Sequence, residues 1–249
     1  MITLKSEREI QMMKGAGEIL AACHNEISNI IKPGISTLEI DSFVELFLKK
    51  NGATPEQKGY KGFEFATCAS VNDEICHGFP RRDPLQDGDI VTIDMVVNWK
   101  GALADSAWTY AIGNVSKSAQ NLLMITEKAL YKGIEQAVCG NRTGDIGHAI
   151  QSYTEAEGFS VVRDFTGHGI GPTLHEDPQI LHFGAPGRGY RLREGMVITI
   201  EPMINEGLWG SKMDSNGWTA RTVDGKLSAQ YEHTIAITKE GPLILTQQS

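Results

Sequence analysis

Four acidic residues lie in or next to apolar, strand-like stretches, where a charged side chain is unusual. Asp94 interrupts one such stretch, and Asp105 follows eleven residues later in the next. Glu201 ends a third stretch, and we expect Glu232 in the middle of a fourth. A buried carboxylate costs free energy unless hydrogen-bond donors or opposite charges compensate it. For Asp94 and Asp105 alone, a solvent-facing side chain or a pairing arginine or lysine is an equally good explanation.

The fifth candidate is a histidine framed by glycines, His168 in the run Gly167–Gly171. Pro172 follows directly and no helix pattern begins there, so the run lacks the helix N-terminus that a phosphate loop requires. Glycines around a histidine let the backbone pack closely while the imidazole points inward. His175 lies seven residues later. For either histidine alone, an ordinary hydrogen-bonded role is the simpler interpretation.

Together, Asp94, Asp105, His168, Glu201 and Glu232 supply four carboxylates and one imidazole. If these side chains converge, two divalent cations would balance the four negative charges and lower the pKa of water between them towards ~7. Such an oxygen-rich set favours Mn, Fe or Co, is compatible with Zn, and excludes a thiolate site. The four cysteines agree, because none are spaced as Cys-x-x-Cys.

The composition describes an ordinary globular chain of 249 residues, 41% apolar and 22% charged. The formal net charge of −8 disfavours a nucleic-acid partner. No apolar run approaches the roughly 18 residues of a membrane helix, and the first residues lack the apolar core of a signal peptide. We therefore expect a cytoplasmic protein with reduced thiols and no membrane partner.

Two capping boxes predict where the first helices begin, Ser6 with Glu9 and Ser36 with Glu39. Apolar residues at helical spacing follow each, and the second helix is expected to stop at Gly52. Further helices are expected over residues 118–138 and 143–157. Strands are expected over residues 66–71, 89–99, 102–112, 159–164, 197–204, 218–223 and 227–238.

Turn residues suggest how some of these strands pair. With a two-residue turn at Trp99 and Lys100, Asp94 and Asp105 would face each other directly, whereas a bulge would make them diagonal neighbours. Asp224-Gly225 predicts a hairpin between the last two strands. The order helix, helix, strands occurs twice along the chain, which favours an α+β domain built by duplication, with sheet in the middle and helices outside. No linker divides the chain, so we expect one catalytic domain over residues 1–249.

The chain resembles the type I methionine aminopeptidases, in their short bacterial form, along nearly its whole length. Ser70–Gly78 is similar to the family segment that carries its first active-site histidine, here His77, and Asp94 and Asp105 are similar to its first two metal ligands. Gly167–Gly171, followed by His175–Pro178, is similar to the signature around a ligand histidine and a second catalytic histidine. Glu201-Pro202 and Glu232-His233 are similar to the segments with the last two ligands. The short spacing between Glu201 and Glu232 leaves no room for the subdomain of the type II class.

The resemblance implies the pita-bread fold, an α+β fold with pseudo-twofold duplicated halves and a central antiparallel sheet covered by helices. It implies a dinuclear metallo-exopeptidase that removes methionine from nascent polypeptides whose second residue is small. Asp94, Asp105, His168, Glu201 and Glu232 would bind the two divalent ions. Glu201 would also be the general base, His175 would stabilise the tetrahedral oxyanion, and His77 would hydrogen-bond the scissile amide.

The resemblance also implies a substrate pocket and further partners. The pocket would be lined by Tyr60, Phe63, Cys68, His77, Leu174, His175 and Trp218. Phe63 and Leu174 stand where several members have Tyr and Phe, which keeps the pocket apolar but alters its shape. Asn72 and Ser228 resemble positions of a monovalent-cation site, with backbone packing an equally good role. A monomer is expected, and docking on ribosomes is left open.

Two other functions remain at this point. The first is another enzyme of the same fold, a proline aminopeptidase or prolidase, although those carry an additional N-terminal domain. The second is a non-catalytic binding protein on this scaffold, which arises when ligands are lost; all five ligands are present here.

Overall fold

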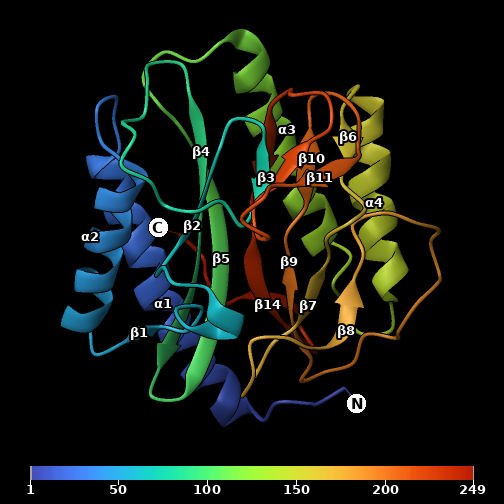
Figure 1. Cartoon of the computed structure of the whole chain (residues 1–249). Helices are drawn as coiled ribbons and strands as arrows, with labels where there is room; N and C mark the ends of the chain where they lie inside the picture. Colours follow the sequence, from blue (N-terminus) through green and yellow to red (C-terminus); the bar gives the residue numbers. More distant parts are fainter. Residues whose placement is uncertain (1, 249) are drawn as a thin grey trace.

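The computed structural model describes residues 2–248 and places the strands between two pairs of helices (Figure 1). Helices α1 and α2 lie on one side, and α3 and α4 lie on the other. Their bounds are α1 Glu7–Ile30, α2 Thr37–Lys50, α3 Lys117–Ile134 and α4 Thr143–Ala156, with a short 3₁₀ helix η1 at Tyr60–Gly62. Within residues 2–248, no helix combines the length and the apolar character that crossing a membrane would require.

Both predicted capping boxes are confirmed. The Ser6 hydroxyl accepts from the Glu9 backbone N–H, and the Glu9 side chain accepts from the Ser6 N–H at 2.7 Å. Ser36 and Glu39 make the same reciprocal pair at the start of α2. Each box satisfies backbone donors that the first helical turn leaves free, so the sequence predicts these helix starts to the residue.

The first half contains two long strands and three short ones. They are β1 Thr54–Pro55, β2 Cys68–Val71, β3 Glu74–Cys76, β4 Ile90–Trp99 and β5 Ala102–Ala111. β4 pairs antiparallel with β5 on one side, and with β1 and β2 on the other. α1 and α2 cover this sheet, and Leu20, Ile27, Ile40, Val91 and Ile93 are fully buried between the layers.

The β4–β5 hairpin turns one residue later than the sequence suggested. Trp99 pairs with Ala102, so Lys100 and Gly101 form the turn, both with left-handed φ (54° and 83°). Two positive φ angles suit a two-residue hairpin, because they match the strand twist. Asp105 is therefore opposite Val96 rather than Asp94. The expected direct pairing is wrong: the two aspartates are diagonal neighbours on one face, and no bulge is involved.

The second half has shorter strands in three sheets. They are β6 Ser160–Val161, β7 Gly167–Gly169, β8 Glu176–Ile180, β9 Val197–Ile200, β10 Met203–Asn205, β11 Ser211–Met213, β12 Ala220–Thr222, β13 Ser228–Gln230, β14 His233–Thr238 and β15 Gly241–Ile244. The orders are β15-β14-β9-β7-β8, β13-β10-β6 and β11-β12-β3, and every pair is antiparallel. α3 and α4 pack against this half.

Two predicted strands are in fact divided, each at an acidic candidate. The strand expected over 197–204 breaks at Glu201-Pro202, where Pro202 has no N–H for a sheet ladder. The strand expected over 227–238 breaks at Tyr231-Glu232, so Glu232 does not lie in mid-strand. Its N–H donates instead to the Ala107 carbonyl of β5, at 2.9 Å.

Two smaller predictions also need correction. The strand expected over 159–164 is reduced to β6. The strands beside Asp224-Gly225 do not form a hairpin, because β12 pairs with β3 and β11 whereas β13 pairs with β10. Local turn chemistry was outweighed by partners from distant parts of the chain.

The two halves meet where β5 runs beside β13 and β14. Thr234 donates its hydroxyl to the Asp105 carbonyl (2.8 Å) and accepts from the Asp105 N–H (2.9 Å). The Ser106 hydroxyl donates to the Glu232 carbonyl at 2.9 Å. Side chains thus replace a regular ladder at this junction, and they place Asp105 next to Glu232.

Candidate metal centre

The junction between the halves encloses a cavity of about 350 Å³. All five candidate ligands and all seven candidate substrate residues line it; these are Asp94, Asp105, His168, Glu201 and Glu232, with Tyr60, Phe63, Cys68, His77, Leu174, His175 and Trp218. They come from both halves of the chain. The structure therefore brings together every catalytic, substrate-binding and ligand residue that the sequence suggested.

The ligand candidates converge on one side of this cavity. Asp94 and Asp105 come from the hairpin β4–β5, His168 from β7, and Glu201 and Glu232 from the two strand breaks. The His168 Nε2 lies 3.6 Å from the Asp105 Oδ2 and 3.7 Å from the Glu201 Oε1. One ligand atom each from Asp105, His168 and Glu232 lies within 4.8 Å of the others, a spacing that a metal ion could bridge.

The imidazole of His168 is oriented for coordination. Its Nδ1 lies 2.9 Å from the Gly169 carbonyl, which can only accept, so Nδ1 carries the proton and Nε2 keeps its lone pair. The backbone N–H of His168 donates to the Thr199 hydroxyl at 2.9 Å, and that hydroxyl donates to the Glu201 carboxylate at 2.8 Å. A histidine whose second nitrogen is bonded in this way is the usual arrangement in metal sites.

The four carboxylates are crowded in a buried place. Burial, reinforced by mutual repulsion, raises the pKa of Asp94, Glu201 and Glu232 well above their ordinary values. Burial also raises the pKa of Asp105 to about 7. Among residues 2–248, no lysine or arginine forms an ion pair with any of the four. Pairing with a basic side chain therefore does not explain the acidic cluster.

Divalent metal ions fit this arrangement. The buried atoms Asp105 Oδ1 and Glu232 Oε1 have no hydrogen-bond partner within the described residues. Buried polar atoms without a partner are rare and costly, and these two belong to carboxylates that face a lone pair of His168. Four oxygen ligands and one nitrogen suit hard or borderline divalent ions. The donor set and its electrostatics thus match the expected cofactor.

Two further histidines, His77 and His175, line the same cavity as the candidate ligands. Burial lowers the pKa of each to about 4, so both imidazoles are neutral at pH 7. The His175 ring lies 4.3 Å from the His168 ring, and its Nδ1 is 3.1 Å from the Tyr60 hydroxyl. Neutral imidazoles at the edge of the acidic cluster can donate hydrogen bonds to a substrate without adding charge.

The rest of the cavity wall is mostly apolar. Phe63 packs edge-on against Trp218 at 5.1 Å, and Phe63, Cys68 and Leu174 are buried. Phe165, which the sequence analysis did not identify, packs edge-on against His77 at 5.6 Å. Aromatic and sulfur-containing walls are suited to an unbranched thioether side chain.

Other contributors to the site were also missed. Gln230 lines the cavity, and its Nε2 lies 3.4 Å from the Glu201 Oε2. Thr199 connects His168 to Glu201, as described above. Both lie two residues before an acidic candidate ligand, so strand alternation was an available signal. Gln57 lies in the loop after β1 and donates to the Asp94 carbonyl at 3.1 Å. No local sequence pattern predicts this contact.

Asn72 and Ser228 lie side by side outside the cavity lining. The Ser228 N–H donates to the Asn72 carbonyl at 2.9 Å, and Asn72 has a left-handed φ of 57°. The Asn72 side chain bonds both the Ile90 N–H and the Asp89 carboxylate. These contacts are consistent with a role of both residues in backbone packing. A monovalent cation beside them stays a prediction.

Comparison with known proteins agrees with the geometry. The model of metallopeptidase family M24 matches residues 11–239. Methionine aminopeptidase 1 of Bacillus subtilis (strain 168) is 52% identical over 247 residues, which cover 99% of this chain and 100% of the relative. Methionine aminopeptidase of Clostridium perfringens is also 52% identical, over 246 residues and 99% of both chains.

Solved structures give the same result. Methionine aminopeptidase from Rickettsia prowazekii superposes with a TM-score of 0.98 at 42% identity, covering 99% of this chain and 100% of that one. The pita-bread fold expected from the sequence is thereby confirmed. The prolidase from Pyrococcus horikoshii OT3 reaches a TM-score of 0.79 at 25% identity, and this chain covers only 64% of it.

Proposed function

Because the chain belongs to metallopeptidase family M24, and within it to the methionine aminopeptidases, we propose that the five converging ligands and the adjacent apolar pocket are its active site. The protein is a metal-dependent aminopeptidase that removes N-terminal methionine. The observation that supports this site best is the juxtaposition of an uncompensated acidic cluster with a cavity lined by Phe63, Cys68 and Trp218.

The metal ligands in this proposal are Asp94, Asp105, His168, Glu201 and Glu232. When bound, divalent metal ions supply Lewis acidity and make water a stronger acid at neutral pH. The protein contributes the charge that attracts these ions and the fixed orientation of each ligand. Thr199 orients both His168 and Glu201, and Thr234 orients Asp105.

Three residues handle protons and developing charge. Glu201 takes a proton from the attacking water, since its carboxylate faces the cavity and is hydrogen-bonded on one oxygen by Thr199. His175 donates to the oxyanion of the tetrahedral intermediate. His77 donates to the scissile amide and aligns the peptide bond. These are catalytic roles because each group touches reacting atoms.

Substrate selectivity follows from the walls of the cavity. Tyr60, Phe63, Cys68, Leu174 and Trp218 enclose the methionine side chain, and His77 and His175 line the same cavity. The substrate is the free N-terminus of a nascent polypeptide or peptide.

The first experiment compares products from short peptides. The purified protein, supplied with Mn or Co, is expected to release methionine from Met-Ala-Ser and to leave Ala-Pro-Ser and the dipeptide Ala-Pro intact. Cleavage of the proline substrates without methionine release would support a proline aminopeptidase or prolidase. Tight peptide binding without any product would support a non-catalytic binding protein instead.

A peptide series Met-X-Ser tests the second position. We expect kcat/KM for X = Ala, Gly, Ser or Thr to exceed that for X = Ile or Leu by roughly tenfold or more. Forcing extra methylenes into a packed site costs ~1–3 kcal/mol, and a β-branched side chain cannot rotate freely away from the rim. Equal kcat/KM values for X = Ala and X = Ile would contradict this steric account.

Several finer statements stay predictions from the sequence or from the resemblance. They concern cobalt or manganese as the working metal, a cytoplasmic location, a monomeric state, docking on ribosomes, and one catalytic domain over residues 1–249. Titration of the apoprotein with single metals against activity tests the first of them.

A further inference from the structure

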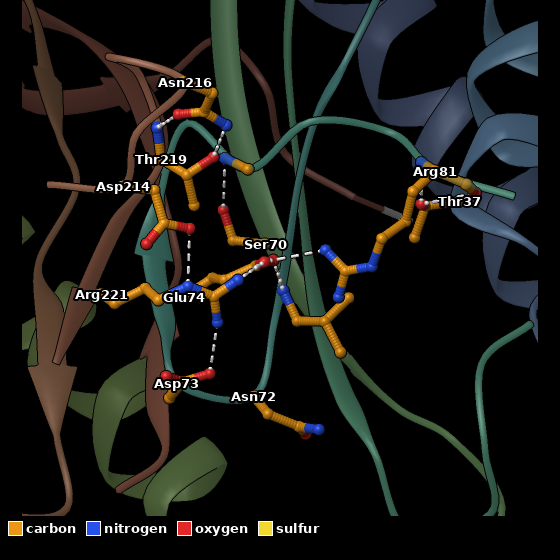
Figure 2. A network of polar contacts seen from close by, with 12 residues as sticks. Thr37, Ser70, Asn72, Asp73, Glu74, Arg81, Asp214, Asn216, Thr219 and Arg221 are labelled. Atoms are coloured by element: carbon orange, nitrogen blue, oxygen red, sulfur yellow. Dashed lines mark hydrogen bonds and ion pairs between the residues drawn. The ribbon is translucent and has the colours of Figure 1, made fainter. Parts of the chain in front are cut away.

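A group of charged side chains lies outside the cavity lining and has no part in the mechanism above (Figure 2). We call it the Arg221 cluster; its members are Asp73, Glu74, Arg81, Asp214 and Arg221. Asp73 lies in the turn between β2 and β3, Glu74 in β3, Arg81 in the loop after β3, Asp214 in the loop between β11 and β12, and Arg221 in β12. These segments lead directly to two residues of the pocket wall, His77 and Trp218.

Arg221 binds three carboxylates with three different nitrogens, as Figure 2 shows. Its Nη2 lies 2.6 Å from the Glu74 Oε1, its Nη1 lies 2.7 Å from the Asp73 Oδ1, and its Nε lies 2.7 Å from the Asp214 Oδ2. The planar guanidinium fixes the directions of all three bonds at once. The three carboxylates are therefore held in one arrangement around it.

Glu74 connects this arrangement to the backbone. Its side chain is 2% exposed. One carboxylate oxygen accepts from the Val71 N–H at 2.6 Å, and the other accepts from Arg81 (2.8 Å) as well as from Arg221. A buried carboxylate saturated with donors on both oxygens sets the position of the strand that carries it. That strand, β3, ends one residue before His77, whose φ of 56° is left-handed.

Asp214 connects Arg221 to the loop that carries Trp218. The Asp214 N–H donates to the Thr219 carbonyl at 2.8 Å, and the Asn216 side chain accepts from the N–H groups of Trp218 (3.0 Å) and Thr219 (2.9 Å). The Thr219 hydroxyl donates to the His77 carbonyl at 3.3 Å. Internal hydrogen bonds thus hold the loop that carries Trp218, and one further hydrogen bond connects it to the segment that carries His77.

We propose that Arg221 is a positioning residue that sets the separation of His77 and Trp218. The two rings meet edge-to-face, with centroids 6.3 Å apart. Arg221 lies three residues after Trp218, and Glu74 lies three residues before His77, so the bond between Arg221 and Glu74 closes a frame around both rings. This proposal rests on the proposed function, because that function places both rings against the methionine substrate.

The first test is Arg221→Met in the holoenzyme, assayed with Met-Ala-Ser. We expect kcat/KM to fall roughly tenfold to a hundredfold, as small misplacements of substrate-aligning groups do. KM rises because Trp218 lines the side-chain pocket, and kcat falls because His77 moves. Metal stoichiometry by calorimetry stays unchanged. The control is Arg142→Met, which removes an exposed guanidinium hydrogen bond at the start of α4 and should keep wild-type kinetics.

Acrylamide quenching of Trp218 fluorescence gives a second readout, independent of activity. Subtracting the fluorescence of the same protein with Trp218→Phe isolates the contribution of Trp218. Quenching is expected to increase in Arg221→Met and not in Arg142→Met. Asp214→Ala provides a milder variant, because Asp214 is partly exposed and its loss leaves the bonds of Glu74 intact; it should change KM and quenching in the same direction, by less.

Wild-type KM, kcat and quenching in both Arg221→Met and Asp214→Ala would overturn the positioning role. So would a loss of activity matched by loss of bound metal, since that indicates general disruption. If the wild-type protein itself released no methionine, the proposed function would fail, whereas the quenching result would still report whether Arg221 fixes Trp218.

Discussion

Asp105→Ala and Glu232→Ala are each expected to abolish methionine release and to remove metal binding. Both carboxylates are buried, and each has an oxygen without a hydrogen-bond partner among the described residues. Together with His168 they form the group whose ligand atoms lie within 4.8 Å of one another. Loss of either carboxylate removes a central oxygen donor and a charge that balances the cations.

Calorimetric titration of the apoproteins with Mn or Co provides the measurement. The wild-type protein should bind metal with a defined stoichiometry and unfold at a higher temperature when loaded, since a ligand that binds only the folded state stabilises it. Both effects should disappear in the two variants. Asp41→Asn is the matched control: Asp41 is a buried carboxylate bonded to Thr67 and does not line the cavity. Unchanged stoichiometry in both alanine variants would rule out these ligand assignments.

His175→Ala is expected to lower kcat by roughly 10²–10³, the usual cost of losing one oxyanion donor, while metal binding and the folded structure are retained. The Tyr60 hydroxyl can donate to the His175 Nδ1 at 3.1 Å, which leaves the proton on Nε2. A neutral histidine with its free N–H next to the acidic cluster is arranged to donate to an oxygen that becomes negative during the reaction.

Steady-state kinetics with Met-Ala-Ser test this role. His148→Ala is a suitable control, because His148 is exposed on α4 and absent from the cavity lining. Tyr60→Phe should reduce kcat by less than His175→Ala, since it removes only the bond that orients the ring. A wild-type turnover rate in His175→Ala would show that this histidine does not stabilise the oxyanion.

The sequence alone determined the features that depend on neighbouring residues. Ser6 and Ser36 predicted two helix starts, because a capping box is complete within four residues. Apolar stretches predicted β4 and β5, and the isolated acids in or beside such stretches predicted which carboxylates could bind metal. The pattern pointed to these candidate ligands because an uncompensated charge in an apolar strand requires a partner wherever the strand lies.

Only the tertiary structure decided how these elements meet. It moved the hairpin turn to Lys100 and Gly101, which makes Asp94 and Asp105 diagonal neighbours. It also ended a strand just before Tyr231-Glu232, whereas the break at Glu201 has a local cause in Pro202. At Glu232 the backbone N–H bonds to Ala107, in the other half of the chain, and no window around residue 232 contains that partner.

The Arg221 cluster shows more clearly that local sequence cannot predict contacts between distant segments. Asp73 and Arg221 lie far apart in the sequence, and although Asp73 belongs to the segment Ser70–Gly78, no motif includes Arg221. Their ion pair forms because β3 and β12 are hydrogen-bonded strands. Local sequence determines which side chains can do chemistry, whereas long-range strand pairing decides their distances, because hydrogen bonds between distant segments fix the backbone from which those side chains project.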